Sequence, residues 1–262
     1  MTRLVKKDIE SIDSNLNHLD QRLRESTGHS LLEIGAFAMS KELPLRQTKV
    51  AVVPITTGLG IIDGFSEKVK EILIHLGTDA FTTTKTDIGG IQEAFDHQAA
   101  IVFMADDDVF SAFHLHKRSY SDNGAATGRG FAAALYLAAE QNAAMEVLVL
   151  GAGPVGQAAI EFLLEKNVQI VLAECDKPKA AQCQKKYPEI KLADDWAARH
   201  YQYILDATPA ANLIKTKNVT DETIISAPGV PLGVAAEAAE NADRIIHNLL
   251  ELGVATMLCA VS

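Results

Sequence analysis

The sequence predicts an α/β protein made of two α/β domains, and three observations lead to this prediction. The apolar run Glu146–Leu150 has the length and composition of a buried parallel strand. A glycine-rich turn, Gly151–Gly156, follows it directly, and apolar residues at helical spacing follow the turn over 157–166. Apolar strands and amphipathic helices also alternate over 49–105, which favours an open parallel sheet in the first half of the chain.

Each glycine of the turn has a separate physical task. Gly151 permits the tight bend, Gly153 lets the backbone approach a pyrophosphate, and Gly156 lets the helix pack closely on the strand. A second apolar strand, 168–173, ends at Glu174, where such folds place an acceptor for the adenosine ribose hydroxyls. Strand, turn, helix, strand and acid within about 30 residues predict a C-terminal Rossmann-type domain that binds NAD. The plainer alternative is a glycine turn that binds nothing.

The acid at the end of the second strand bears on the choice of cofactor. The carboxylate of Glu174 favours NAD over NADP, because it would repel the 2′-phosphate. Lys177 and Lys179 follow within a few residues and weaken that preference. Asp176 would take the ribose instead if the strand ends later than expected.

Composition bounds the class of protein. The 262 residues are enough for two modest domains, and 48% hydrophobic with 22% charged residues can bury a core. A formal net charge of −10 argues against nucleic acid or an anionic membrane surface as partner. No apolar run predicts a membrane span, and the first residues lack an apolar signal core. Cys175, Cys183 and Cys259 lack metal spacing, so we expect plain thiols in a reducing cytoplasm.

The first 39 residues are expected to form one or two amphipathic helices. Apolar residues recur every three or four positions from Leu4 to Leu23, and Gly28 is a natural stop. Such a segment usually packs on the outside of a domain. The alternative is a mobile lid that closes over an active site.

The rest of the first half should build the predicted sheet. We expect strands over 49–56, 79–84 and 100–105, and helices over 63–76 and around 91–97. Ligands gather at the carboxyl ends of the strands in open α/β sheets. Two stretches occupy those ends, namely Thr56–Gly60 and Asp106–Asp108.

The alanine-rich stretch 124–142 predicts a long helix whose small side chains suit close packing between two domains. The domain boundary is expected just after it. This gives an N-terminal substrate and catalytic domain, 1–142, with the N-terminal helix as its lid, and a Rossmann-type NAD-binding domain, 143–262. The remaining expected elements are a helix over 178–187, strands over 202–207 and 223–227, and a last β/α segment over 244–261.

The acidic cluster at the end of the third strand is the most informative feature of the first half. Asp106, Asp107 and Asp108 repel one another, so at least one of them should have a partner. A solvated acidic turn is one interpretation, and a pocket aspartate that binds the ammonium of an amino-acid-like substrate is the other. His114 and His116 would point to different faces of a helix, so we interpret them as surface residues.

Two strand ends of the second half, Asp206–Pro209 and Ser226–Gly229, resemble the cofactor-edge loops of nicotinamide dehydrogenases. Proline turns without a ligand are the alternative. No Ser-His-Asp or Cys-His arrangement, Walker lysine or zinc spacing is recognisable. Because hydride transfer needs little from the protein beyond orientation, a dry pocket and a contact to the substrate, the sequence points to an oxidoreductase without a conspicuous general base.

Six sequence words carry a resemblance to a known family. They are VPITTGLGIIDGFSE (53–67), IVFMADDDVF (101–110), LVLGAGPVG (148–156), LDATPAA (205–211), SAPGVPLG (226–233) and LGVATML (252–258). Together they resemble the pyrrolysine synthase (PylD) family, and the likeness runs over nearly the whole chain. The first two words are far more specific than the dinucleotide fingerprint.

The resemblance implies a reaction. In this family, lysine acylated on its side-chain nitrogen by 3-methyl-D-ornithine is oxidised with NAD. The terminal amine carbon of the ornithine gives hydride to NAD, and the resulting imine is hydrolysed with loss of ammonia to a semialdehyde. The α-amine of the ornithine then attacks the aldehyde and loses water, which closes the pyrroline ring.

The resemblance also implies site residues. Asp106 would be the catalytic residue that holds the ornithine ammonium. The substrate-binding residues would be Leu4, Val5, Ile55, Thr56, Phe65, Asp106, Asn248, Ala255 and Thr256. The cofactor-binding residues would be Gly151, Gly153, Pro154, Val155, Gly156, Glu174, Cys175, Leu205, Ala207, Thr208, Pro209, Ser226, Pro228 and Gly229. Because the N-terminal helix closes over the substrate in this family, the resemblance favours the lid.

The chain departs from the family pattern at one place. Archaeal members have a Glu-Pro-Leu word before the last turn, where this chain has Asn248-Leu-Leu beside His247. Asn248 can accept a hydrogen bond but carries no charge. Its contact with the substrate amine would then be weaker, or Asp106 and Asp107 would take a larger share.

Two alternative functions stay open. Another small amino-acid or shikimate-type NAD(P)-dependent dehydrogenase would also fit the second-half loops, and a catalytically silent NAD-sensing regulator would fit the same scaffold. We expect a homodimer, because such folds commonly pair. The small molecule that the protein binds as substrate would be methylornithyl-lysine, and no nucleic acid, membrane or metal partner is expected.

Overall fold

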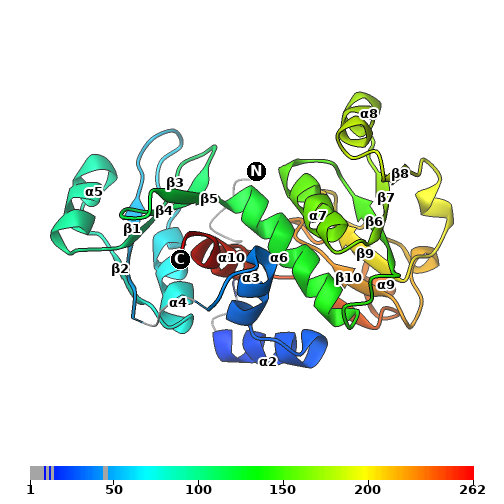
Figure 1. The fold of residues 1–262 in the computed structure, drawn as a ribbon, viewed down its shortest axis with the longest axis horizontal. Helices are drawn as coiled ribbons and strands as arrows, with labels where there is room; N and C mark the ends of the chain where they lie inside the picture. Colours follow the sequence, from blue (N-terminus) through cyan, green and yellow to red (C-terminus); the bar gives the residue numbers. More distant parts are fainter. Residues whose placement is uncertain (1–8, 10–11, 13–14, 44–46) are drawn as a thin grey trace. The chain divides into compact units, whose positions relative to one another are not determined.

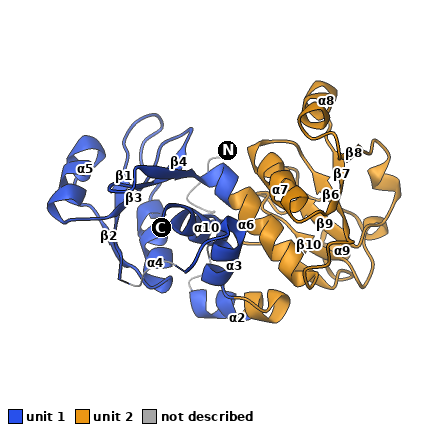
Figure 2. Cartoon of the chain, viewed as in Figure 1, with its two compact units in different colours: residues 1–21, 30–126, 249–262 blue, residues 22–29, 127–248 orange. Residues whose placement is uncertain are grey.

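The structure, a computed structural model, describes Ile9, Ile12 and residues 15–43 and 47–262. The chain divides into two compact units (Figure 2). Unit 1 comprises residues 1–21, 30–126 and 249–262, and unit 2 comprises residues 22–29 and 127–248. The last residues of the chain thus share a unit with the first half. The expected boundary between independent domains at residue 142 stays a prediction.

Unit 2 is built on a six-stranded parallel sheet (Figure 1). Its strands are β6 (Glu146–Leu150), β7 (Gln169–Ala173), β8 (Lys191–Leu192), β9 (Tyr203–Asp206), β10 (Ile224–Ser226) and β11 (Arg244–Ile246). The spatial order is β11-β10-β9-β6-β7-β8, which is the Rossmann order 3-2-1-4-5-6 counted from β6. The strand order reverses between β6 and β9, so the loops after these two strands border the crevice where such sheets bind ligands.

The helices of unit 2 follow local sequence signals. They are α6 (Asn123–Ala138, which begins in unit 1), α7 (Pro154–Glu165), α8 (Lys177–Lys186) and α9 (Ala236–Ala239). Helix α7 begins three residues before the expected start, because a proline suits the first helical turn. Helix α6 ends four residues before the expected end, because Glu140 and Gln141 take left-handed φ angles of 54° and 57°. A Cβ atom on Gly128 of α6 would lie 2.1 Å from the Val155 carbonyl oxygen of α7, so these helices pack closely.

Unit 1 contains a five-stranded mixed sheet in the order β2-β1-β3-β4-β5. Its strands are β1 (Lys49–Pro54), β2 (Asp79–Thr82), β3 (Ile101–Ala105), β4 (Phe110–His114) and β5 (Ser119–Asp122). Strands β1, β2 and β3 are parallel, as predicted, but β4 and β5 add an antiparallel extension that the sequence analysis missed. The helical interpretation of the two histidines is therefore wrong. His114 ends β4, and its Nδ1 accepts the backbone N–H groups of His116 and Lys117.

Within the described part of the chain, five further helices lie wholly or partly in unit 1. They are α2 (Leu16–Thr27, which ends in unit 2), α3 (Leu31–Met39), α4 (Phe65–His75), α5 (Asp87–Asp96) and α10 (Glu251–Val261). The predicted stop at Gly28 is confirmed, since this residue has a φ of +76° between α2 and α3. A capping box of Ser30 and Glu33 starts α3.

Helix α10 is the core helix of unit 1. Nearly all of its residues are buried, and it packs against α3, α4, β4 and β5. A Cβ atom on Gly35 of α3 would lie 3.0 Å from the backbone of Ala255, so the glycine permits the close contact. The apolar sequence of α10 fits a helix covered on all sides. Among the helices that the structure describes, none is long and apolar enough to cross a membrane.

Candidate functional site

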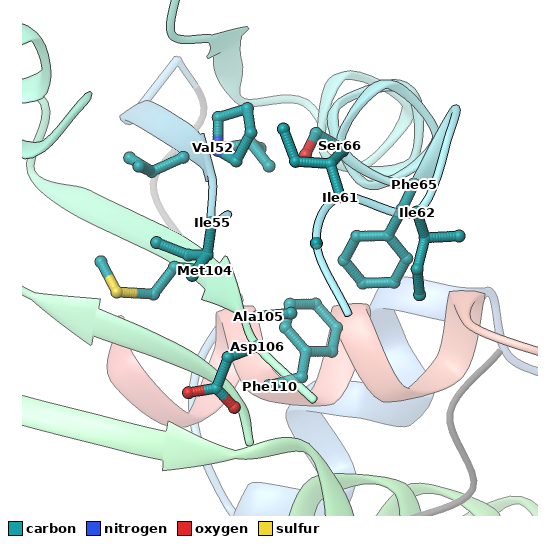
Figure 3. A pocket seen from close by; sticks show the side chains of 13 residues that line it. Val52, Ile55, Ile61, Ile62, Phe65, Ser66, Met104, Ala105, Asp106 and Phe110 are labelled. Atoms are coloured by element: carbon teal, nitrogen blue, oxygen red, sulfur yellow. The ribbon is translucent and has the colours of Figure 1, made fainter. Parts of the chain in front are cut away.

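A pocket opens at the carboxyl ends of β1 and β3 in unit 1, where the strand order of the sheet predicts a ligand (Figure 3). Its cavity volume is about 30 Å³, which is room for a small group. The lining residues are mostly apolar. They are Val52, Val53, Pro54, Ile55, Gly60, Ile61, Ile62, Phe65, Ser66, Met104, Ala105, Asp106 and Phe110.

Two phenylalanines form a fixed wall of this pocket. The rings of Phe65 and Phe110 meet edge to face, with centroids 5.2 Å apart, and Phe110 is buried. Of the residues expected around the substrate, the structure brings Ile55, Phe65 and Asp106 to this pocket. That these three residues bind the substrate stays a prediction.

Asp106 lies at the mouth of the pocket, where β3 ends (Figure 3). Its Oδ1 accepts the backbone N–H groups of Asp108 at 2.8 Å and Val109 at 2.7 Å. The Asp106 N–H in turn donates to the Val109 carbonyl oxygen at 2.9 Å. These bonds fix the carboxylate at a tight turn. Both side-chain bonds use Oδ1, and Oδ2 takes part in neither. Asp106 is exposed, so a charged ligand can reach it.

The neighbouring acid has a structural task. Oδ2 of Asp107 accepts the Leu59 backbone N–H at 2.6 Å. Gly58 has a φ of +75°, and a Cβ atom there would lie 2.0 Å from the same oxygen. Asp107 therefore holds the loop that follows β1 against the turn that follows β3, and Gly58 makes room for it.

Thr56 is held by an acid that the sequence analysis did not single out. Asp87, the first residue of α5, accepts the Thr56 backbone N–H at 2.8 Å and its hydroxyl at 2.7 Å. These two bonds, the backbone bond first, lower the pKa of Asp87 below its ordinary value. Because the Thr56 hydroxyl donates to Asp87, its oxygen remains only as an acceptor for a ligand. Thr56 itself is not among the residues that line the pocket.

The other expected substrate residues lie elsewhere. Ala255 and Thr256 are fully buried in α10, where the Thr256 hydroxyl donates to the Leu252 carbonyl oxygen at 2.8 Å, and neither lines the pocket. Asn248 is buried and belongs to unit 2. Leu4 and Val5 lie outside the described residues. The substrate roles of all of these residues stay predictions.

The glycine turn after β6 has the shape that the sequence predicts. Gly151 has a φ of +91°, and a Cβ atom on Gly156 would lie 2.0 Å from the Gly151 carbonyl oxygen. A Cβ atom on Gly153 would instead project into open space, with only Lys179 Nζ within reach at 4.0 Å. The space in front of Gly153 adjoins the start of α7, whose first N–H groups have no side-chain cap. This arrangement fits the pyrophosphate of a dinucleotide.

Glu174 organises the same turn. Its side chain is only 7% exposed, and Oε2 accepts the Ala152 N–H at 2.8 Å. Oε1 accepts the Asp176 N–H at 3.0 Å and the Cys175 thiol at 3.3 Å. Burial by itself would raise the pKa of Glu174, but the bonds from Asp176 and Ala152 bring it below its ordinary value. The acid is therefore ionised beside the glycine turn.

A second buried acid stands on the opposite side of the strand-order reversal, at the end of β9. Asp206 is fully buried, and its Oδ1 accepts the N–H of Thr208 at 3.0 Å and its hydroxyl at 2.7 Å. Oδ2 has no hydrogen-bond partner among the described residues, and a Cβ atom on Gly233 would lie 1.8 Å from it. Burial raises the pKa of Asp206 above its ordinary value.

The remaining expected cofactor residues lie around this acid. The Gly229 N–H donates to the Asp206 carbonyl oxygen at 3.2 Å, and a Cβ atom on Gly151 would lie 3.2 Å from the Thr208 methyl group. Ala207, Pro209 and Pro228 are at least partly exposed at these strand ends, whereas Leu205 is buried in the sheet. The Ser226 hydroxyl donates to the Phe131 carbonyl oxygen of α6 at 2.8 Å, which gives it a packing role.

A further buried acid, Glu251, was not predicted from the sequence. Glu251 at the start of α10 is 2% exposed, and its Oε2 accepts the Leu250 N–H at 2.9 Å. A glutamate in the first turn of a helix is ordinary, so no local signal marks its burial. Within the described part of the chain, no group of three or more His, Cys, Asp and Glu side chains could hold a metal ion.

Similar solved structures share the fold. The chain resembles shikimate dehydrogenase from Aquifex aeolicus with a TM-score of 0.54 at 14% identity, covering 83% of this chain and 91% of that one. It resembles shikimate 5-dehydrogenase from Thermus thermophilus, solved in complex with NADP(H) and shikimate, with a TM-score of 0.51 at 14% identity, covering 82% and 91%. At this level of identity the likeness concerns the two-domain α/β fold alone.

Sequence comparisons are more specific. A family model described as "Pyrrolysine biosynthesis protein PylD, N-terminal domain" matches residues 8–121. Pyrrolysine synthase from Methanosarcina acetivorans is 31% identical over 268 residues, covering 100% of both chains. Pyrrolysine synthase from Methanosarcina barkeri is 30% identical over 269 residues, covering 100% of this chain and 98% of the relative. The resemblance found in the sequence words is confirmed, and the chain belongs to the pyrrolysine synthase (PylD) family.

Proposed function

We propose that this protein is an NAD-dependent oxidoreductase that forms L-pyrrolysine. Its substrate would be (3R)-3-methyl-D-ornithyl-N6-L-lysine. The terminal amine carbon would be oxidised to a semialdehyde with release of ammonia, and ring closure with loss of water would follow. Full-length similarity to two proteins named pyrrolysine synthase supports this proposal.

The observation that carries the proposal is the open face of Gly153 at the start of α7. It leaves space for a pyrophosphate beside uncapped backbone N–H groups, at the strand-order reversal of a Rossmann sheet. NAD, when bound there, would supply the hydride acceptor. Gly151, Gly153 and Gly156 with Pro154 and Val155 would hold the pyrophosphate.

Glu174 supports NAD as the dinucleotide. Its buried, ionised carboxylate would accept the ribose hydroxyls and repel the 2′-phosphate of NADP. Cys175 lies next to it and would contact the same ribose. The strand-end loops with Ala207, Thr208, Pro209, Pro228 and Gly229 would flank the rest of the cofactor, and Leu205 and Ser226 would support them from within the sheet.

The pocket of unit 1 supports an aliphatic amine as the substrate. Asp106 would hold the ammonium at the pocket mouth and so orient the neighbouring C–H bond, which makes it the proposed catalytic residue. Ile55 and Phe65 would contact the methylated chain, which suits the mostly apolar lining of the pocket. The Thr56 oxygen, held by Asp87, would accept a further hydrogen bond.

The proposal includes expectations beyond these two sites. Leu4 and Val5 would close over the substrate, and Asn248, Ala255 and Thr256 would contribute to its binding. The protein would act as a homodimer in the cytoplasm, which size-exclusion chromatography with light scattering and cell fractionation would check.

The test is a spectrophotometric assay of NADH formation with purified protein. The synthetic methylornithyl-lysine should give NADH, whereas free 3-methyl-D-ornithine, alanine and shikimate should give none. NADH formation with shikimate in place of the amide would favour the shikimate-type alternative. Tight NAD binding without turnover of any of the four compounds would favour the NAD-sensing regulator.

A further inference from the structure

Lys179 in the first turn of α8 occupies the space in front of the glycine turn. Its Nζ lies 3.5 Å from Glu174 Oε2 and 4.0 Å from the position of a Cβ atom on Gly153, where nothing else lies within 4 Å. The open face of the turn is thus bordered by an ammonium group. The Lys179 side chain is 41% exposed, so it can move when a ligand arrives.

The backbone of Lys179 is fixed even though its side chain is not. Asp176 caps α8, and its Oδ1 accepts the Lys179 backbone N–H at 3.1 Å. The lysine therefore starts from a defined position, and its long stem lets the ammonium reach either Glu174 or the space before Gly153.

The Lys179 ammonium limits the access of a ligand to Glu174. The two oxygens of Glu174 already accept from Ala152, Asp176 and Cys175, and a carboxylate offers about four lone-pair sites. The ammonium lies 3.5 Å from Oε2 as an ion pair, beside the oxygen that a ligand would approach. The two backbone bonds are part of the fold. The lysine is the partner that can leave most easily, because its contact is long and partly exposed.

We propose that Lys179 is a cofactor-binding residue. When a dinucleotide binds, the lysine side chain moves, so that the ammonium leaves Glu174 and pairs with the pyrophosphate. This inference rests on the proposed function, because it assumes a dinucleotide at the glycine turn. The exchange clears the space beside Glu174 Oε2 for the ribose hydroxyls and places a positive charge on the pyrophosphate. Glu174 then faces the ribose without its lysine partner, so its charge would repel the 2′-phosphate of NADP.

Lys177 provides the matched control for the test. It lies two residues earlier in the same helical turn, carries the same charge and is exposed. K179M and K177M change the net charge equally, so any difference between them reports on position. Equal melting temperatures of the two variants would show that both are folded.

The measurement is the equilibrium affinity for NAD and NADP by calorimetry at low and high salt. K179M should weaken NAD binding about threefold to tenfold and reduce its salt dependence, whereas K177M should change neither. Equal effects of K179M and K177M on affinity would overturn the proposal. A wild-type protein that binds neither dinucleotide would overturn the proposed function instead.

A second pair of variants tests the part of Glu174. E174Q should raise the affinity for NADP relative to NAD, and the double variant E174Q/K179M should bind both dinucleotides about threefold to tenfold more weakly than E174Q does. If E174Q/K179M binds both as well as E174Q does, Lys179 does not contact the pyrophosphate. If E174Q does not fold, the comparison of K179M with K177M still decides the proposal.

Discussion

The acids at the strand ends of the two units differ in their exposure to solvent. In unit 2, Glu174 and Asp206 are buried and receive backbone N–H groups from the loops that they organise. In unit 1, Asp106 is exposed at the pocket mouth, and Leu59 and Ile61 of the adjoining loop are 81% and 50% exposed. The acids of unit 2 are thus held inside the fold, whereas Asp106 of unit 1 is open to solvent, which supports the proposal of a common cofactor in unit 2 and a particular substrate in unit 1.

This difference in exposure matches the different demands of binding a dinucleotide and binding a particular substrate. A dinucleotide presents the same phosphates and riboses to every protein that binds it, so backbone atoms and glycines can be shaped for it in advance. The charge and chain length of a particular substrate have to be matched by side chains, and Asp106 keeps one oxygen outside its turn bonds for such a contact. Four sets of variants would break or sharpen this contrast.

The largest effect is expected at the glycine turn. G153V should retain the wild-type melting temperature, because its Cβ atom has space, and should lose NAD affinity at least about a hundredfold, since two or more charge-assisted hydrogen bonds of about 1.5–3 kcal/mol each are blocked. G156A should instead lose about 1–3 kcal/mol of unfolding free energy, because its Cβ atom would meet the Gly151 carbonyl oxygen. Calorimetry and chemical unfolding separate the two outcomes. Wild-type NAD affinity in G153V would refute the pyrophosphate assignment.

The open acid of unit 1 should affect the substrate and not the cofactor. D106N should lower kcat/KM for the amide substrate about tenfold to a hundredfold, the size of a lost charge-assisted hydrogen bond, while NAD affinity stays unchanged. D108N is the matched control, since Asp108 is an exposed acid of the same turn. Similar losses in both variants would mean that only the general charge of the turn matters.

The buried acid of unit 2 should make stability depend on pH. The raised pKa of Asp206 means that the native state keeps its proton where the unfolded state has lost it. The contribution of Asp206 to the unfolding free energy should therefore fall as pH rises from the unfolded-state pKa, about 4, up to the raised native value, by at most about 1.4 kcal/mol per pH unit. D206N keeps the acceptor for Thr208 and cannot ionise, so this contribution should disappear from its pH profile. Parallel pH profiles of wild type and D206N, from urea unfolding, would contradict the assignment.

The smallest effect is expected at the acid that holds Thr56. D87N keeps an oxygen for the Thr56 N–H but weakens the grip on its hydroxyl, so KM for the amide should rise a few-fold with kcat nearly unchanged. E93Q is the control, because Glu93 makes similar bonds to Thr84 and Lys85. An equal change in KM for both variants would show that Asp87 only stabilises its loop.

Local sequence was sufficient for the cofactor half of the molecule. The strand, the glycine turn and the acid at the end of β7 lie within about 30 residues, so the contacts that define the cradle are short in sequence. Gly151 and Gly156 take the positions that their lack of a side chain requires. Even so, the close contact of Gly233 with Asp206 belongs to no sequence motif, and only the structure reveals it.

Unit 1 was less predictable, because its contacts join residues far apart in sequence and belong to no known motif. Asp87 reaches Thr56 across 31 positions, and Asp107 reaches Leu59 across 48. The antiparallel strands β4 and β5 were missed because Phe110–His114 is short and buried through its first three residues, so it lacks a clean alternation. Helix α10 packs in unit 1 with the backbone of Ala255 close to Gly35, and no local sequence pattern predicts this contact.

The most direct test of the central claim is to quantify NADH and ammonia together during turnover of the synthetic amide. We expect equal amounts of both, with pyrrolysine as the product identified by mass spectrometry, because each hydride leaves a carbon whose nitrogen is then lost. NADH formed without ammonia, or no NADH from a protein that binds both NAD and the amide, would contradict it.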